Sequence, residues 1–483
     1  MALLSFVDRR RTPARLGLGV LATALLLSTA GCGSRASDQD IVDALRATAS
    51  GPAAAGEVAI GAPAAASAVP GAAQAPAVSG NASGQETDNS ATAGRAATPN
   101  NPKTSGAGSG KAAAAAPGAA APQVASKSQV TVGMIGPFSG VLGVIGASAP
   151  KTLAAWAAHA NSRGGVNGHP VKLIAGDDQG DPATALTLVK RMVESDKIIA
   201  MVGNINVFGF AQVEKYTKEK GVPLIGGDAI DPGYATSTNA FLVSAPVSTQ
   251  IVKGLQLLVT KGASKIAVMY CLEVSAICSY LTEQAQKSEV GPKITQTYQV
   301  SLVAPSYTSQ CIRMKDGGID ALYMLMDTAA AARVLQNCAT QGFKPPTMLL
   351  GLDATKEMPS IPALADSLIP GATFSPATAG VPAVENYRQV MAAFGPSIGN
   401  SGITSLTWAA AEMFALIGTN LSANPTSAEL YEALWKVKDQ NLGGLIVPVS
   451  YAKGKPSQTK PCMFLWGVQN GAFSAPQGAK PVC

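Results

Sequence analysis

The sequence predicts an α/β protein whose parallel sheets form two lobes behind a long N-terminal tether. Short apolar runs alternate with helical patterns from residue 129 onward, which is typical of βαβ units and parallel sheets. The segment 129–483 is longer than a chain that packs around a single hydrophobic core usually is, so two lobes are expected. The residues before 129 are mostly Ala, Gly, Pro, Ser and Thr and predict no packed domain.

The first residues have the features of a secretory signal. Arginines cluster between residues 9 and 15, and an apolar run follows at 16–27. That run is shorter than the roughly 20 apolar residues of a membrane span. The sequence Ser-Thr-Ala-Gly-Cys at 28–32 resembles a bacterial lipobox, which implies a signal segment 1–31 and a diacylglycerol on Cys32. An ordinary signal peptide with an incidental cysteine is the alternative.

Residues 32–128 are interpreted as a disordered tether behind the lipidated Cys32. Residues 33–128 contain no Phe, Trp or Tyr, so they cannot bury enough apolar surface to offset the entropy of ordering. The folded part would then be held on the outer face of the bacterial cell membrane, an extracytoplasmic location. The net charge of +6 belongs partly to these segments, and the folded part has no basic run, so no nucleic-acid partner is expected.

The alternation in the folded part predicts nine strands. In chain order they cover 129–137, 170–178, 198–203, 222–227, 265–270, 293–300, 319–326, 347–352 and 371–376. Helical patterns lie between them, for example at 148–165, 181–195 and 328–342. The second of these helices begins with Asp181-Pro182, an N-cap followed by proline in the first turn.

Six cysteines follow Cys32, and an even number in an exported domain argues for three disulfides. Sequence alone leaves fifteen connectivities open. Pairing of neighbours is the most economical, and it joins Cys271 to Cys278, Cys311 to Cys338 and Cys462 to Cys483. Zinc is a poor alternative, because there is no CxxC and the chain has two histidines. No metal site is expected.

The sequence offers little for catalysis. It has no GxSxG elbow, HExxH, phosphate-binding GxxxxGK[ST] or GxGxxG after a strand. His159 lies in a helix of small apolar residues, and His169 lies in a turn that leads into a strand. A packed or surface histidine is a better interpretation of each than a catalytic base. An enzyme and a cofactor are therefore not expected.

Several motifs in order resemble one family. They are Gly-Pro-Phe-Ser-Gly at 136–140, Gly-Gly-Val-Asn-Gly at 164–168 and Asp-Asp-Gln at 177–179, continued at 307–343 and 445–466. Together they resemble the leucine/isoleucine/valine-binding type of periplasmic solute-binding protein. The resemblance covers essentially all of 129–483. Each motif is weak alone, but their order and spacing are specific.

This resemblance implies a type I periplasmic-binding-protein fold, with two doubly wound parallel-sheet lobes joined by a three-strand hinge. Lobe one would be formed by 129–247 and 377–447, and lobe two by 248–376 and 448–483. The implied function is that of a substrate-binding lipoprotein of an ABC importer. A monomer would capture a small polar solute, amino acid or amide-like, between the lobes by hinge closure and deliver it to permease and ATPase subunits.

Two other functions stay open at this stage. The first is a ligand-sensing protein of the same fold that signals to a membrane receptor or kinase. The second is an enzyme or wall-structural protein that uses the fold as a scaffold. Neighbouring genes for a permease or a kinase would separate transport from sensing.

The binding site is expected beyond the carboxyl ends of the parallel strands. The candidate ligand-binding residues are Phe138, Ser139, Asn204, Asn206, Val207, Phe208, Asp228, Ala229, Glu273, Ser275, Asp327 and Asp353. Each of the four acids in this set has an alternative interpretation. Asp327 and Asp353 also stand where an N-cap would precede a helix, and Asp228 and Glu273 are alternatively solvated loop acids. Asp231-Pro232 is interpreted as a cap alone.

The resemblance also bears on the ligand. In relatives that bind amino acids, hydroxyl groups hold the ligand carboxylate, and the corresponding positions here are Val207 and Ile230. The family's acidic partner for the ligand ammonium aligns with Asp353, while tyrosine positions fall at Asp327 and near Ser275. The site thus gains acid and loses carboxylate-binding hydroxyls. An amide, a urea-like solute or a cationic amino acid would suit it.

Overall fold

The structure, a computed structural model, describes residues 125–140 and 143–483. The signal segment 1–31, Cys32 and the tether as far as residue 124 lie outside the described residues. The first described residues already contact the folded part, because the amides of Ser126 and Lys127 donate to the Gly168 carbonyl at 3.2 and 3.0 Å. Within these described ranges, no helix combines the length and the apolar character needed to cross a membrane.

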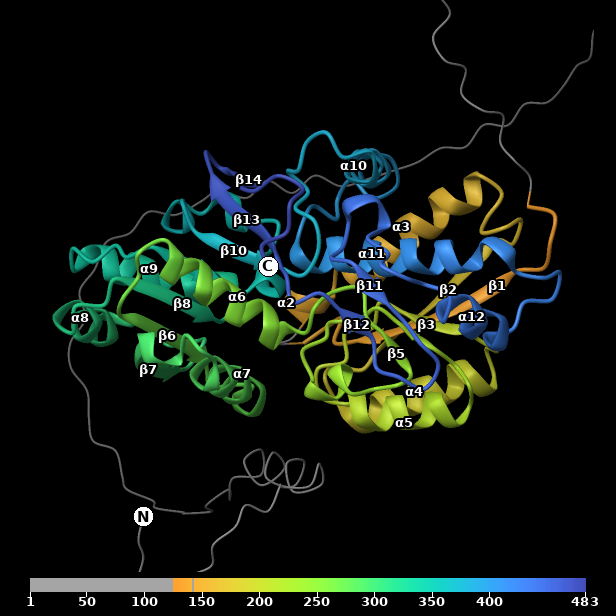
Figure 1. Cartoon of the computed structure of the whole chain (residues 1–483), viewed down its shortest axis with the longest axis horizontal. Helices are drawn as coiled ribbons and strands as arrows, with labels where there is room; N and C mark the ends of the chain where they lie inside the picture. The colour runs from red at the N-terminus through yellow and green to blue at the C-terminus, as the bar shows by residue number, and fades with distance from the viewer. Residues whose placement is uncertain (1–124, 141–142) are drawn as a thin grey trace, which may run out of the picture. The chain divides into compact units, whose positions relative to one another are not determined.

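The first sheet has five parallel strands (Figure 1). Their order is β2 (Val171–Asp177), β1 (Val130–Gly136), β3 (Ala200–Val202), β4 (Leu224–Ile225) and β5 (Ala240–Phe241). Successive residues of β1 point to opposite faces, so Met134 and Ile135 belong to different apolar clusters. Both faces are therefore buried, as expected of a parallel sheet.

Helices cover both faces of this sheet. Residues of α3 (Ala149–Ser162) and α11 (Gly402–Ile417) share one cluster with Met134, and those of α4 (Pro182–Glu194) and α5 (Phe210–Glu219) share the other with Ile135. The start of α4 follows the expected pattern, because the Asp181 carboxylate accepts from the Thr184 amide at 2.7 Å. The capping box of Ser401 fixes the start of α11 in the same way.

The second sheet has seven strands. Their order is β14 (Ala472–Ser474), β13 (Phe464–Gln469), β10 (Leu368–Gly371), β9 (Thr347–Leu349), β8 (Ala321–Leu325), β6 (Ile266–Cys271) and β7 (Ile294–Val300). The five strands from β10 to β7 are parallel, whereas β13 and β14 join as antiparallel neighbours. The buried side chains of α6 (Val247–Thr260) and α7 (Ser275–Lys287) pack on one face, and those of α8 (Thr308–Asp316) and α9 (Thr328–Thr340) pack on the other.

The chain passes between the two sheets three times, after β5, after β10 and before β13. The crossing segments are hydrogen-bonded to their surroundings: the Phe374 amide donates to the Leu445 carbonyl at 3.0 Å, and the Tyr451 hydroxyl donates to the Leu242 carbonyl at 2.6 Å. The remaining elements are α2 (Gly143–Gly146), α10 (Pro382–Phe394), α12 (Ser427–Leu434), β11 (Val449–Ser450), β12 (Gln458–Thr459) and the short 3₁₀ turns Pro232–Ala235, Gly291–Lys293, Gly351–Asp353, Met358–Ser360, Pro362–Leu364, Gly418–Asn420 and Leu442–Gly444.

One sequence expectation is corrected here. The last expected strand, 371–376, is displaced, because β10 covers Leu368–Gly371 and the chain then leaves the sheet as a crossing segment. In that segment the Thr373 carbonyl accepts from the Trp466 indole at 3.0 Å. This side chain takes the place of the hydrogen-bond donor that a neighbouring strand would supply. The expected parallel sheets are present, and β13 joins the second of them as an antiparallel strand, because it enters from a crossing segment and not through a βαβ connection.

The expected disulfides are confirmed as Cys271–Cys278, Cys311–Cys338 and Cys462–Cys483. The second joins α8 to α9, the neighbouring helices on either side of β8 in the chain. The third ties residue 483 to the residues that precede β13. Disulfides of this kind stabilise a fold mainly by restricting the unfolded chain.

Candidate functional site

Asp228 lies beyond the carboxyl end of β4 and is nearly fully buried, at 1% exposure. The turn that carries it needs left-handed backbone, with φ of 71° at Gly226 and 124° at Gly227. One oxygen of Asp228, Oδ1, accepts from the Ile230 amide at 3.3 Å, whereas Oδ2 is buried and has no hydrogen-bond partner among the described residues. The burial excludes the interpretation of Asp228 as a solvated loop acid.

Burial also changes how Asp228 titrates. Loss of solvent raises the pKa of its carboxyl to about 7, against the opposing hydrogen bonds from the amides of Ile230 and Asn206. The charges of Asp231 and Asp178 act in the same direction as burial. Asp178, after β2, is 3% exposed, and burial raises its pKa to about 6. The carboxyl group of Asp228, beyond the end of β4, is therefore partly protonated at neutral pH.

Asp353 occupies the corresponding place after β9 of the seven-stranded sheet. It ends the 3₁₀ turn Gly351–Asp353, and no helix begins there, so its expected role as an N-cap is wrong. Its side chain makes no hydrogen bond with any described residue, although its backbone carbonyl accepts from the Thr328 hydroxyl at 2.7 Å. Burial and then the nearby charge of Asp327 raise the pKa of Asp353 to about 7.

Asp327 does cap a helix. Its Oδ1 accepts from the amides of Ala329 and Ala330 at 2.8 and 3.1 Å, at the start of α9. This confirms the capping interpretation, and a capping carboxylate can still present its other oxygen to a ligand. The charge also suits the positive end of the helix dipole.

Glu273 and Arg333 hold one loop between them. Glu273 Oε1 accepts from the Ser301 hydroxyl at 2.7 Å and from the Leu302 amide at 2.8 Å, and Arg333 Nη2 donates to the Leu302 carbonyl. Burial alone would raise the pKa of Glu273, but the bonds from Ser301 and Leu302 outweigh it and lower the pKa. The disulfide Cys271–Cys278 closes the turn that carries Glu273. Glu273 and Arg333 thus each have a hydrogen-bond partner in the loop at residues 301–302.

These groups line one cavity of about 340 Å³, which has walls from both sheets. Its other walls are aliphatic. They come from Pro137, Ile145, Ile205, Val207, Ile230, Val274, Ile277, Leu281, Leu302, Val303, Leu325, Met326, Ala329, Leu350, Leu352 and Ile403. Among the described residues that line it, none carries an aromatic ring, a hydroxyl or a side-chain amide. The cavity size and its few polar groups are those of a site for one small molecule.

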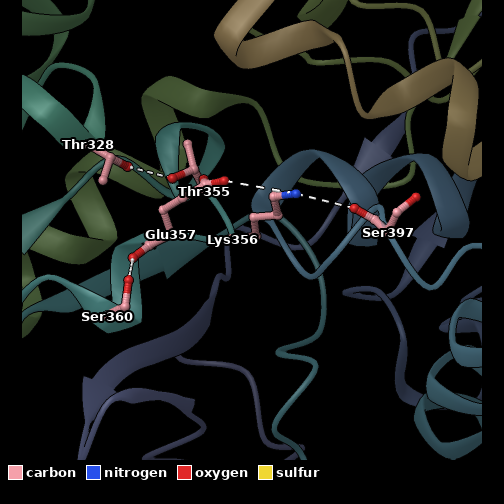
Figure 2. A network of polar contacts seen from close by, with 6 residues as sticks. All are labelled: Thr328, Thr355, Lys356, Glu357, Ser360 and Ser397. Carbon is pink, nitrogen blue, oxygen red and sulfur yellow. Dashed lines mark hydrogen bonds and ion pairs between the residues drawn. The ribbon is translucent and has the colours of Figure 1, made fainter. Parts of the chain in front are cut away.

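A second cavity of about 480 Å³ continues from the first and shares Asp327 and Asp353 with it. It is more polar, as Figure 2 shows: the Thr355 hydroxyl points to Thr328 at 3.4 Å, and Lys356 Nζ donates to the Ser397 carbonyl at 3.2 Å. The last contact joins the segment after β9 to the loop between α10 and α11. The cavity lined by Asp228 is thus the apolar end of a longer cleft.

The structure brings together five of the twelve expected site residues, namely Val207, Asp228, Glu273, Asp327 and Asp353. The other seven lie outside that cavity lining. Asn204 and Asn206 are buried and accept from the amides of Ile135 and Gly209, so they shape the strand ends. The remaining five are Phe138 and Ser139 in a turn after β1, Phe208 after β3, the buried Ala229, and Ser275 at the first position of α7.

Sequence reasoning missed most of the aliphatic wall and Arg333. The wall residues belong to strand ends, α7 and α11, where an aliphatic side chain carries the same pattern whether it faces a core or a cavity. Arg333 lies within the expected helix 328–342, and its Nε is buried without a partner among the described residues. A lone arginine on the inner face of an alanine-rich helix is the signal that could have identified it.

Comparisons with known proteins agree with this geometry. A family model described as periplasmic binding protein matches residues 129–472. A Leu/Ile/Val-binding protein homolog 2 from Brucella abortus is 24% identical over 224 residues, which cover 45% of this chain and 60% of the relative. The chain therefore spans less than two thirds of that relative.

Two solved structures share the fold. An extracellular ligand-binding receptor from Verminephrobacter eiseniae superposes with a TM-score of 0.62 at 17% identity, over 71% of this chain and 99% of that chain. A solute-binding protein of an ABC transporter from R. palustris, in complex with benzoate, superposes with a TM-score of 0.58 at 16% identity, over 74% of this chain and 97% of that chain.

Proposed function

Because this chain belongs to the periplasmic binding protein family, we propose that it is the solute-binding subunit of an ABC importer. It captures a small polar solute in the cavity between the two sheets and delivers it to a permease. The observation that carries this proposal is the cavity of about 340 Å³, which receives Asp228 from one sheet and Asp353 from the other. A ligand held by both would bridge the sheets.

Capture requires the ligand to favour a closed form over an open one. The three crossing segments are the hinge about which the two sheets approach each other. A ligand shifts this equilibrium only through the contacts that it makes in the closed form and loses in the open form. Asp228 and Asp353 supply such contacts, since each is attached to a different sheet. The aliphatic walls lose water when the ligand enters.

Family membership implies an extracytoplasmic location. We propose further that Cys32 is lipidated and that residues 32–128 tether the folded part to the outer face of the cell membrane. The permease and ATPase subunits are separate chains in this account. The proposed lipidation is checked by the mass of the mature chain, which would carry diacylglycerol and lack residues 1–31.

The proposed function predicts a stabilising ligand in a thermal-shift screen of the purified chain with its disulfides formed. The panel contains branched-chain, cationic and acidic amino acids, amides, urea and small aromatic acids such as benzoate. A compound at about 100 times its dissociation constant adds about 2.7 kcal/mol to the free energy of unfolding.

The same screen with Asp353→Ala provides the control. We expect the shift to disappear in this variant while the unliganded chain is not destabilised, because Asp353 makes no side-chain hydrogen bond with the described residues. A panel in which no compound shifts the melting temperature would count against an amino-acid or amide-like solute.

A further inference from the structure

We propose that the solute is an aliphatic ammonium compound without a carboxylate, whose cationic end is bound by Asp228 and Asp353. This inference rests on the proposed function and names the class of solute for the same cavity. It follows from three features of the lining residues: their aliphatic character, two carboxyl groups with oxygens left free for a ligand, and the apolar residues at the positions where a ligand carboxylate would be held.

The walls select the body of the ligand. Ile205, Ile277 and Leu281 are typical of them, and no lining residue that the structure describes carries an aromatic ring, a hydroxyl or a side-chain amide. A sugar or another polyol would leave its hydroxyl groups without partners on such walls, at the cost of burying them unpaired. An aliphatic chain or branched alkyl group has no polar atom to leave unpaired there, and its binding is favoured because its apolar surface is removed from water.

Two of the four carboxyl groups are available to a ligand. Asp327 is engaged by the first amides of α9, and Glu273 is engaged by Ser301 and Leu302. Asp228 keeps a buried Oδ2 without a partner, and Asp353 makes no side-chain hydrogen bond with the described residues. Native structures seldom leave a buried group such as Oδ2 of Asp228 unpaired, so this oxygen is expected to meet a hydrogen-bond donor from the ligand. The half-buried Asp353 lines the same cavity and supplies a second acceptor. An ammonium group has three donors.

The same cavity is poorly equipped for a carboxylate. Val207 and Ile230 stand beside Asp228 in the wall and offer no hydroxyl. Arg333, the single cation among the described lining residues, already donates to the Leu302 carbonyl. Four acids and one base give the site a negative character, which attracts a cation and repels an anion. A ligand carboxylate held by the free Nε of Arg333 is the alternative, and it makes the opposite prediction for the compounds below.

The test is a calorimetric titration of the full chain with four compounds that share one branched skeleton. They are 3-methylbutylamine, leucine, 4-methylpentanoate and 4-methylpentanamide, which present an ammonium, a zwitterion, a carboxylate and an amide. We expect the amine to bind about tenfold or more tightly than each of the others, as for a hydrogen bond to a charged group. Asp228→Asn and Asp353→Asn should each weaken amine binding by about tenfold or more.

Asp316→Asn is the matched control, because Asp316 is exposed at the end of α8 and lines neither cavity. Its affinity for the amine should equal that of the parent chain. The thermal unfolding of each variant without ligand separates loss of binding from loss of folding.

Two results would overturn the inference and leave the proposed function standing. One is tighter binding of leucine or 4-methylpentanoate, lost in Arg333→Gln, which would assign the ligand carboxylate to Arg333. The other is tighter binding of the amide, or no binding of the amine while another compound of the thermal-shift panel stabilises the chain. Failure of every compound in both experiments would overturn the inference and the proposed solute class together.

Discussion

Replacing Asp228 with asparagine is expected to raise the stability of the unliganded chain near pH 8. The parent buries this carboxyl group with one oxygen unpaired, and burial raises its pKa to about 7. Above that pH the folded chain must hold an ionised carboxylate away from water. Asparagine has nearly the same shape, keeps the oxygen that accepts from Ile230 and carries no charge.

The sign of the pH dependence follows from proton binding. Between about pH 4 and pH 7 the folded chain keeps a proton on Asp228 that the unfolded chain has released, since an unfolded aspartate has a pKa of about 4. The free energy of unfolding of the parent therefore falls as pH rises through this window. A shift of about three pKa units corresponds to at most about 4 kcal/mol, and we expect about 1–3 kcal/mol after the relaxation of the site.

Denaturant unfolding of the parent and Asp228→Asn at several pH values between about 4 and 8 measures this difference. The two curves should meet near pH 4 and separate as pH rises, with the variant more stable. Asp178 and Asp353, whose pKa values burial raises to about 6 and about 7, stay in both chains, so the variant keeps a weaker slope of its own. Parallel curves would mean that Asp228 is not the group that titrates. The exposed Asp316→Asn serves as the control and should follow the parent.

Replacing Trp408 with alanine is expected to cost about 3–5 kcal/mol of stability, the range for a large buried aromatic side chain. Trp408 is fully buried in α11, with 0% exposure, and its ring meets that of Tyr387 edge-to-face at 5.4 Å between centroids. The helix that carries it packs on the five-stranded sheet and places Ile403 in the cavity wall. Loss of this side chain would leave a void beside Tyr387 of α10.

Trp435→Ala is the matched control for that prediction. Trp435 follows α12, is only partly buried and stacks on Tyr431 at 5.6 Å. The same chemical change there should cost clearly less, because solvent already reaches the ring and no core void is left. Denaturant unfolding of both variants gives the comparison, and equal losses would contradict the assignment of α11 to the core.

Much of the fold could be predicted because its signals are local. Short apolar strands bounded by turns, and helices with caps at Asp181 and Asp327, carry their pattern in a few neighbouring residues. Helix α11 was not identified, since thirteen of its sixteen residues are buried and the apolar stripe that marks a surface helix is missing. The displaced β10 depended on where the chain leaves the sheet, which tertiary contacts to Trp466 decide.

The site was predicted less completely than the fold. The topological rule located the strand ends, and with them Asp228 and Asp353. It could not say which side chains at those ends turn into a cavity and which pair with the backbone, as Asn204 does with the Ile135 amide. Whether a side chain at a strand end faces the cavity or bonds to a distant strand depends on three-dimensional packing. No periodicity in the sequence indicates it.

The central claim is capture by closure, and a distance across the cleft tests it most directly. Spin labels are placed at the exposed residues Gln212 of α5 and Gln286 of α7. The distance between the two labels, measured by pulsed electron paramagnetic resonance, reports the separation of the two sheets. With a saturating amount of the compound that gives the largest thermal shift, we expect the distance to shorten and its distribution to narrow, and Asp353→Ala to prevent both. An unchanged distribution in the parent chain, with the same compound bound, would contradict the account.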